Sequence, residues 1–210
     1  MAIYDRKNHC FHCTLTYYGP SAGGKTSTLM GISEYCKAEG VIIREVESEV
    51  SEHRHIIKVT VPGISTIHGK PVLMHLRALA GVTLHEHIRL ATLRDVDGVM
   101  FVADSTRDKL QENMRHLQAV AREITNQKQR FNAFPVVLQY NKRDLPSALP
   151  ATILDKYLNP LGWPTFETIG CRLPQPDHEP WITMRTIDAL KALQELVLAK
   201  LNTQLPKLDF

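Results

Sequence analysis

Eight consecutive residues near the N-terminus have the types and the spacing needed to bind a chain of phosphates. They run Gly19-Pro20-Ser21-Ala22-Gly23-Gly24-Lys25-Thr26 and match the pattern G-x-x-x-x-G-K-T. Glycines in such a loop let backbone N–H groups turn toward phosphate oxygens, and the N-terminus of a following helix adds the positive end of its dipole. We predict that Lys25 neutralises the β- and γ-phosphates of a nucleotide and that the Thr26 hydroxyl binds Mg²⁺. The expected phosphate-binding residues are Gly19, Ser21, Ala22, Gly23, Gly24, Lys25, Thr26 and Ser27.

A second group of polar residues, far along the chain, could distinguish one base from another. Asn141-Lys142-Arg143-Asp144 matches N-K-x-D and follows a hydrophobic run. A carboxylate such as Asp144 can accept both adjacent donors of guanine, a pair that adenine lacks, and each charge-assisted hydrogen bond is worth about 1.5–3 kcal/mol. We expect Asn141 to brace this loop and the Lys142 stem to pack over the base. The phosphate loop alone would fit an ATPase, a kinase or a GTPase, but the two motifs together favour a guanine nucleotide.

Alternating strand-like and helix-like segments would place both motifs at strand ends. Strands are predicted at residues 11–18, 55–60, 71–79, 99–103, 134–139 and 165–169, and helices at 26–39, 82–93, 107–129, 151–158 and 182–201. A turn at His68-Gly69-Lys70 would join the second and third strands in an antiparallel hairpin. We expect the Glu-rich segment 41–52 to be a mobile loop over the nucleotide, and the proline-rich segment 170–180 to be irregular. The alternation predicts an α/β fold with a largely parallel sheet.

The composition argues against several other kinds of protein. The 210 residues are 22% charged and 43% hydrophobic with a net charge of +3, a balance typical of one globular domain, here residues 1–210. This charge is too small to indicate nucleic acid or an anionic membrane as the main partner, and no apolar run is long enough to span a bilayer. With no cysteine framework for disulfides, we expect reduced thiols and a cytoplasmic protein.

Two residue types that often bind metals were considered and set aside. Cys10 and Cys13 look like half of a zinc site, but they lie three positions apart on a predicted strand, so that their side chains point to opposite faces. The ten histidines are expected to be solvated or partly buried rather than ligands. Thr26 is therefore the predicted metal ligand.

The motifs and their flanking residues resemble a known family over nearly the whole chain. The distinctive pieces are Tyr17-Tyr18-Gly19-Pro20, the run from Val96 to Ser105, and Gln139-Tyr140-Asn141-Lys142-Arg143-Asp144-Leu145-Pro146. They resemble a Ras-superfamily small GTPase of the P-loop NTPase class, and within it the bacterial MglA branch of gliding and cell-polarity GTPases. The resemblance implies a six-stranded, mostly parallel sheet with one antiparallel hairpin strand, flanked by helices, with Mg²⁺ and GTP or GDP at the strand ends. It also implies a roadblock-type, MglB-like regulator, for which we expect residues 41–52 and 81–94 to be the contact surface.

The segment of this chain that matches the family's second switch lacks the side chains that are usual there. The match Thr60-Val61-Pro62-Gly63 is rejected, because it would leave about thirty residues before the next strand and would lose the hairpin. The preferred match is Ala78-Leu79-Ala80-Gly81, in which the Gly81 N–H would contact the γ-phosphate. Ala78 then stands where most small GTPases have an aspartate that holds Mg²⁺ through water, and where the MglA branch already has threonine. Val82 stands where the family has the glutamine that positions the attacking water.

The segments that match the family's first switch and its guanine-contacting loop near the last strand also depart from the family pattern. Arg54 matches an arginine proposed to act in cis on the transition-state charge, although it could equally be a solvated arginine at the start of a strand. His55 stands where a threonine would bind Mg²⁺, and a neutral imidazole is a poor ligand for that ion. Thr168-Ile169-Gly170-Cys171 replaces the family's S-A-K, and we expect the Gly170 N–H to contact the guanine carbonyl.

Three functions remain open on these grounds. The first is a GTPase switch that hydrolyses GTP slowly, at or below about 10⁻⁴ s⁻¹, with Lys25, Arg54 and Gly81 as its catalytic set, in bacterial polarity or motility. The second is a guanine-nucleotide-binding scaffold that does not hydrolyse GTP, which the changes at Val82, Ala78 and His55 favour. The third is an ATP-using kinase, which would need a lid for an acceptor and would leave N-K-R-D unexplained.

Overall fold

The strand that leads into the phosphate loop lies near the centre of one sheet in the computed structural model, which describes residues 2–41, 46–51, 54–79, 86–170 and 180–205. This strand, β2 (Cys10–Tyr18), pairs in parallel with β5 (Val72–Leu79) on one side and with β6 (Gly98–Asp104) on the other. Beyond β6 follow β7 (Val136–Asn141) and β8 (Thr165–Glu167), again in parallel. Because parallel strands end at the same edge, the loops that follow them converge there.

Three strands extend the sheet in antiparallel pairing. The predicted hairpin is present, with β4 (Arg54–Pro62) antiparallel to β5. Beyond β4 lies β3 (Val46–Ser51), and β1 (Ile3–Asp5) pairs with the start of β2. The α/β class and the mostly parallel sheet are confirmed, but the described residues form eight strands rather than six.

The prediction of a mobile loop over residues 41–52 was wrong for its second half. Residues 46–51 form β3, which pairs with β4 from Val46 opposite Val59 to Ser51 opposite Arg54. Their sequence, V-E-S-E-V-S, is rich in glutamate and suggested a solvated loop. A strand at the edge of a sheet needs only a partner backbone to pair with and can carry polar side chains. Residues 42–45 and 52–53 lie outside the described part of the chain.

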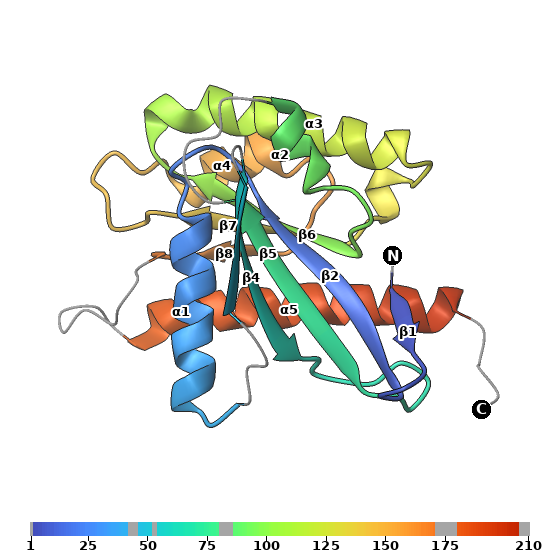
Figure 1. The fold of residues 1–210 in the computed structure, drawn as a ribbon. Coiled ribbons are helices and arrows are strands. Elements are labelled where there is room, and N and C mark those ends of the chain that lie inside the picture. The colour runs from blue at the N-terminus through green and yellow to red at the C-terminus, as the bar shows by residue number, and fades with distance from the viewer. Residues whose placement is uncertain (1, 42–45, 52–53, 80–85, 171–179, 206–210) are drawn as a thin grey trace.

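Helices cover both faces of the sheet (Figure 1). On one face α1 (Lys25–Ala38) packs mainly against β4 and β5, and α5 (Pro180–Gln204) against β6, β7 and β8. Their shared core includes Cys13, Leu15, Met74 and Leu76. On the other face α3 (Leu110–Asn126) and α4 (Ala151–Leu158) pack over β6 and β7, beside the short α2 (Glu86–Ala91). Two 3₁₀ turns, η1 (Arg107–Lys109) and η2 (Phe131–Ala133), flank α3. The predicted helix over 107–129 is thus a turn followed by a helix.

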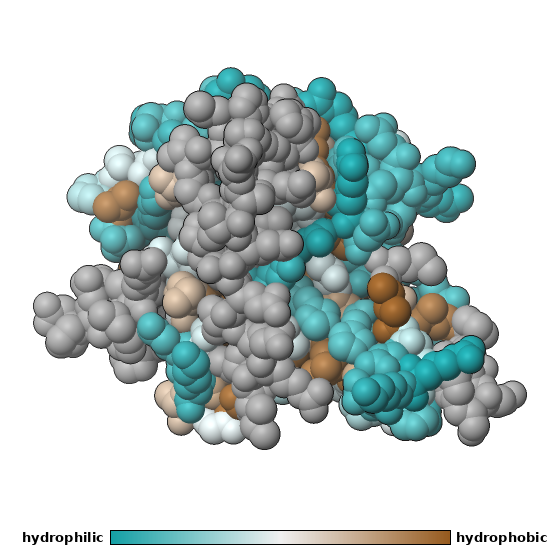
Figure 2. Space-filling model, viewed as in Figure 1, coloured by the Kyte–Doolittle hydropathy of each residue, from teal (hydrophilic) through white to brown (hydrophobic). Residues whose placement is uncertain are grey.

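The buried strands explain why the central segments were recognised from sequence. Every residue of β6 and β7 is buried, as continuous apolar runs predict for strands covered on both faces. The exposed residues of α3 are hydrophilic, although its Asn113 and His116 are buried. The coloured surface at the top of the view in Figure 2, where α3 lies, is mainly hydrophilic. Within the described residues, no helix combines the length and the apolar character that a membrane span requires.

Candidate nucleotide site

The backbone of the phosphate loop is set by close contacts that exclude side chains at two glycines. Gly19 follows β2 with φ +146°, and a Cβ atom there would lie 2.2 Å from the Val102 carbonyl oxygen. Gly24 has φ +98°, and a Cβ atom there would lie 2.0 Å from Asn141 Nδ2. Helix α1 begins directly afterwards, at Lys25, and Gly24 provides no side-chain cap for it. The first N–H groups of α1 therefore have no internal acceptor, which is the condition for binding an anion.

The Lys25 side chain lies against the backbone of the phosphate loop itself. Its Nζ donates to the carbonyl oxygens of Pro20, at 2.6 Å, and Gly19, at 3.2 Å. Burial and the positive charge of Arg89 lower the pKa of Lys25 to about 8, although Glu112 acts in the opposite direction. An anion beside Nζ would reverse both effects. The ammonium group thus has a strong preference for a negatively charged neighbour.

Arg89 is a site residue that the sequence analysis missed. It lies on α2 and lines a small cavity together with Gly19, Ser21 and Lys25 of the phosphate loop. Its Nη1 lies 3.3 Å from His116 Nε2, and its Nε has no hydrogen-bond partner among the described residues. Nothing in the sequence around residue 89 marks it, because α2 approaches the loop only in the folded chain.

Asn141 joins the phosphate loop to the segment after β8. Its Nδ2 donates to the Gly23 carbonyl at 2.8 Å, while its Oδ1 accepts from the Gly170 N–H at 2.6 Å and from the Thr168 hydroxyl at 3.2 Å. The side chain is 1% exposed. One amide thereby connects three loops that are far apart in sequence, and the bracing predicted for Asn141 now has identified partners. The Gly170 N–H has an acceptor here, so a contact with guanine would have to be shared with Asn141.

A buried polar network continues from Asn141 into the sheet. Gln139 Nε2 donates to the hydroxyls of Thr28, at 3.0 Å, and Thr168, at 2.9 Å. Gln139 lies on β7 and Thr28 on α1, so this amide connects the helix of the phosphate loop to the strand that carries N-K-R-D. Each of these side chains is at most 2% exposed. Buried polar groups are stable only when paired, and the pairing holds the two motifs in one arrangement.

Of the remaining N-K-R-D residues, Lys142 is held by an ion pair and Asp144 is exposed. Lys142 Nζ donates to Asp104 Oδ2 at 2.6 Å, and the Thr106 N–H and hydroxyl donate to Asp104 Oδ1. Burial alone would raise the pKa of Asp104, but these hydrogen bonds outweigh it and hold the pKa below its ordinary value. Asp144 is exposed at the end of the motif. Its carboxylate is therefore accessible to a base that enters from solvent.

The predicted switch residues lie at the same edge of the sheet, as far as the structure describes them. β5 runs parallel to β2, with Ala78 opposite Tyr17, and ends at Leu79 beside the phosphate loop. Arg54 and His55 begin β4, and Ile56 pairs with Leu79, so the start of β4 lies at this edge. Gly81 and Val82 lie outside the described residues, as do the side chains of Arg54 and His55.

The rejected second-switch match lies at the far edge. Pro62 pairs with Leu73, which in turn pairs with His12 near the beginning of β2. Thr60-Val61-Pro62-Gly63 therefore runs away from the phosphate loop.

The donor chemistry of the loop suits Mg²⁺ bound together with phosphates. Thr26, in the first turn of α1, offers a hydroxyl oxygen, and Mg²⁺ prefers oxygen ligands and keeps several waters. Ala78, at the end of β5, offers none, and it is fully buried. The residues present thus fit a magnesium ion held by Thr26 and nucleotide oxygens rather than by a cage of protein carboxylates.

Comparison with known proteins agrees with this geometry. No family model matches the chain. A curated protein, the mutual gliding-motility protein MglA of Myxococcus xanthus, is 29% identical over 205 residues, which cover 96% of this chain and 98% of that protein. With this coverage the similarity extends over both nucleotide motifs. The chain is thus similar to an MglA protein over nearly its whole length, and its α/β fold with a mostly parallel sheet is consistent with a small GTPase fold.

Proposed function

We propose that this chain binds GTP and GDP with Mg²⁺ and acts as a molecular switch in bacterial cell polarity or motility. The name of its Myxococcus relative refers to gliding motility. The observation that carries the proposal is the side chain of Asn141, which ties the phosphate loop to the base-reading segments. A protein that only bound phosphate would have no need for that link. Guanine specificity comes from Asp144, which is exposed and can accept the two adjacent donors of the base.

The phosphates are bound by groups that already surround the loop. Lys25 exchanges its two carbonyl acceptors for phosphate oxygens, and the first N–H groups of α1 donate to oxygens of the same phosphates. The Thr26 hydroxyl is the protein ligand for Mg²⁺, which when bound neutralises charge on the β- and γ-phosphates. Arg89 adds a second cation beside the loop, on a helix next to the predicted second switch.

Hydrolysis is proposed to be slow. Val82 can neither donate nor accept a hydrogen bond, so it cannot orient the attacking water, and His55 is a poor partner for Mg²⁺. Lys25, the loop N–H groups and Mg²⁺ still neutralise charge, which is most of what phosphoryl transfer requires. We expect turnover at or below about 10⁻⁴ s⁻¹, with Arg54 supplying part of what is missing and the Gly81 N–H meeting the γ-phosphate.

A non-hydrolysing scaffold is the second candidate. Ala78 favours it, because this buried methyl group stands at the predicted position of a carboxylate that would hold Mg²⁺ through water. Such a protein would bind GTP as a stable structural ligand. The two candidates share the binding site and differ only in turnover.

Two measurements test the proposal in order. Competition of GTP, GDP and ATP against a fluorescent GDP analogue should show ATP as much the weakest, and equal affinities would refute guanine specificity. Single-turnover hydrolysis should then be slow in the wild type, faster in Val82→Gln and slower in Arg54→Ala. No turnover in the wild type and in Val82→Gln, with intact binding, would establish the scaffold instead. Fast wild-type turnover that Arg54→Ala leaves unchanged would refute the assigned catalytic residues.

A roadblock-type, MglB-like protein is the proposed regulator, with residues 41–52 and 81–94 as its contact surface. These segments flank the predicted γ-phosphate position, where a change of nucleotide can alter their order. Arg89 of the second segment also lines a groove of about 700 Å³ along α3, with Glu112 and Arg115. Binding should differ between the GDP-loaded and GTP-analogue-loaded protein in size-exclusion or pull-down experiments. Identical binding in both states would argue against a switch.

A further inference from the structure

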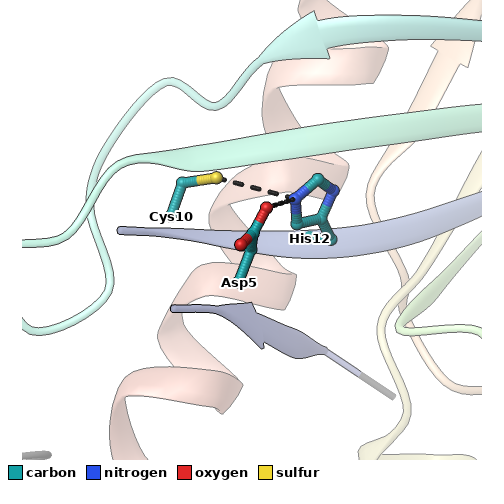
Figure 3. A group of neighbouring side chains, drawn as sticks. All are labelled: Asp5, Cys10 and His12. Atoms are coloured by element: carbon teal, nitrogen blue, oxygen red, sulfur yellow. Dashed lines mark hydrogen bonds and ion pairs between the residues drawn. The ribbon is translucent and has the colours of Figure 1, made fainter. Parts of the chain in front are cut away.

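Three side chains with metal-binding atoms meet at the hairpin between β1 and β2 (Figure 3). His12 Nε2 lies 3.6 Å from Asp5 Oδ2 and 3.6 Å from Cys10 Sγ, and the three atoms all lie within 4.8 Å of one another. The strands bring them together in two ways. Asp5 is the direct cross-strand partner of Cys10, and Cys10 and His12 are two positions apart on β2, which puts both on one face.

The spacing fits a tetrahedral zinc ion. With Zn–S of about 2.3 Å and Zn–N and Zn–O of about 2.0 Å, tetrahedral angles place sulfur and nitrogen about 3.5 Å apart, and nitrogen and carboxylate oxygen about 3.3 Å apart. The observed separations, 3.6 Å in both cases, lie within a few tenths of an ångström of these values. One thiolate, one imidazole and one carboxylate make a ligand set that zinc uses, and the fourth position stays open.

A second histidine is placed to orient the first. His12 Nδ1 lies 2.7 Å from His75 Nε2, and His75 Nδ1 lies 3.0 Å from the Thr60 hydroxyl. When His12 Nε2 binds a metal, its Nδ1–H donates to His75, whose Nδ1–H donates to Thr60. The four ring nitrogens then each have one role: His12 Nε2 binds the metal, His12 Nδ1 and His75 Nδ1 donate, and His75 Nε2 accepts. Zinc-bound imidazoles generally have such a partner, which fixes the tautomer and the ring orientation.

The carboxylate is oriented and the group can be reached from solvent. Asp5 Oδ1 accepts from the N–H groups of Lys7 and Asn8, and Asp5 Oδ2 accepts from Asn8 Nδ2 at 2.7 Å. The side chains of Asp5 and His12 are 27% and 30% exposed, whereas Cys10 is buried at 5%. An ion can therefore enter from the Asp5–His12 side and meet the sulfur underneath.

We propose that Asp5, Cys10 and His12 bind one Zn²⁺ ion, with His75 as a positioning residue and water or an external side chain in the fourth position. The site lies at the beginning of β2, whereas the phosphate loop follows its end. At about 3.3 Å per residue, the seven steps from His12 to Gly19 span about 23 Å, so this inference does not depend on the proposed nucleotide function. The ion would fasten β1 to β2, which is the one strand that β1 pairs with among the described residues.

The test uses the full chain loaded with GDP and excess Mg²⁺, so that the nucleotide site does not compete for zinc. Equilibrium dialysis should show one tightly bound Zn²⁺ per wild-type chain, and Co²⁺ should give a near-ultraviolet thiolate charge-transfer band. Cys10→Ala should abolish that band and His12→Gln should abolish tight binding. His75→Gln should weaken binding about 10–100-fold and keep the band. Controls are Cys36→Ala and His68→Gln, a cysteine on α1 and a histidine in the turn before β5, which should bind like the wild type.

Several results would overturn the proposal. Wild-type protein that binds no more Zn²⁺ than Cys10→Ala, or a charge-transfer band that survives in Cys10→Ala, would do so. If Cys10→Ala does not fold, the wild-type cobalt spectrum decides by itself, and a spectrum without thiolate absorption refutes the site. Zinc should also raise the melting temperature of the wild type and not that of His12→Gln.

Discussion

Replacing Asn141 should uncouple the phosphate loop from the base-reading segments. In Asn141→Ala the Gly23 carbonyl and the Gly170 N–H lose their partners. The Thr168 hydroxyl loses its acceptor but still accepts from Gln139 Nε2. A buried polar group left unpaired costs about 1–3 kcal/mol. Water entering the space of the lost amide would offset part of this for two backbone groups. We therefore expect the free energy of unfolding to fall by about 2–4 kcal/mol, measured by urea denaturation without nucleotide.

The same substitution should weaken nucleotide binding, because the loop is no longer held in its binding geometry. If half of that free energy, about 1–2 kcal/mol, is expressed in binding, the affinity for a fluorescent GDP analogue falls about 5- to 30-fold. Asn141→Asp is a sharper variant. It keeps an acceptor for the Gly170 N–H but puts a carboxylate oxygen where Nδ2 now lies, 2.8 Å from the Gly23 carbonyl oxygen. Two oxygens at that distance repel each other. We expect it to bind GDP at least as poorly as Asn141→Ala.

The matched control is Asn159→Ala. Asn159 also bridges backbone groups, since its Nδ2 donates to the Trp163 carbonyl and its Oδ1 accepts from the Trp163 N–H. It does so after α4 rather than at the phosphate loop, so its loss should lower stability and leave GDP affinity unchanged. Wild-type GDP affinity and wild-type stability in Asn141→Ala would refute the assigned role of this side chain.

Three further predictions concern the base, an acid-sensitive histidine and the core. Asp144→Asn should shift preference from guanine toward xanthine nucleotides, seen as tighter competition by xanthosine diphosphate, and unchanged competition would refute the role of Asp144. Burial and the charge of Arg89 lower the pKa of His116 from 6.5 to about 4, so the unfolded chain binds this proton at a higher pH than the folded chain. The free energy of unfolding should therefore fall as the pH drops from about 6.5 to 4, by up to about 3 kcal/mol, and His116→Gln should flatten that urea-denaturation profile. Gly98→Ala would put a Cβ atom 2.7 Å from Val197 Cγ2 and 3.0 Å from Leu193 Cδ1, and should lower the denaturation free energy by about 1–3 kcal/mol with GDP affinity intact.

Local sequence was sufficient where a motif and its flanking elements reinforce each other. The G-x-x-x-x-G-K-T loop lies between β2 and α1 as predicted, and N-K-R-D begins at the last residue of the buried strand β7. Continuous apolar runs identified β6 and β7, because strands covered by helices on both faces need apolar side chains at every position. The helix over 151–158 was predicted with its observed bounds.

Segments stabilised by backbone pairing could not be recognised in the same way. β3 has a glutamate-rich sequence and β1 has three residues, and both exist because a neighbouring strand offers unpaired N–H and C=O groups. The arginine on α2 is a similar case. Arg89 reaches the phosphate loop through the packing of α2, which no spacing along the chain reveals.

The sequence by itself determined the class of fold, the two nucleotide motifs and their order, since each depends on residues that are neighbours along the chain. Only the tertiary structure decided which distant groups meet. It joined Asn141 to Gly23 and Gly170, and it set Asp5 opposite Cys10 with His12 beside them. The opposite faces predicted for Cys10 and Cys13 are confirmed, with Cys13 in the core, yet Cys10 has other partners. Hydrogen bonds and metal ligands act over a few ångströms in space, and the register of paired strands sets those distances.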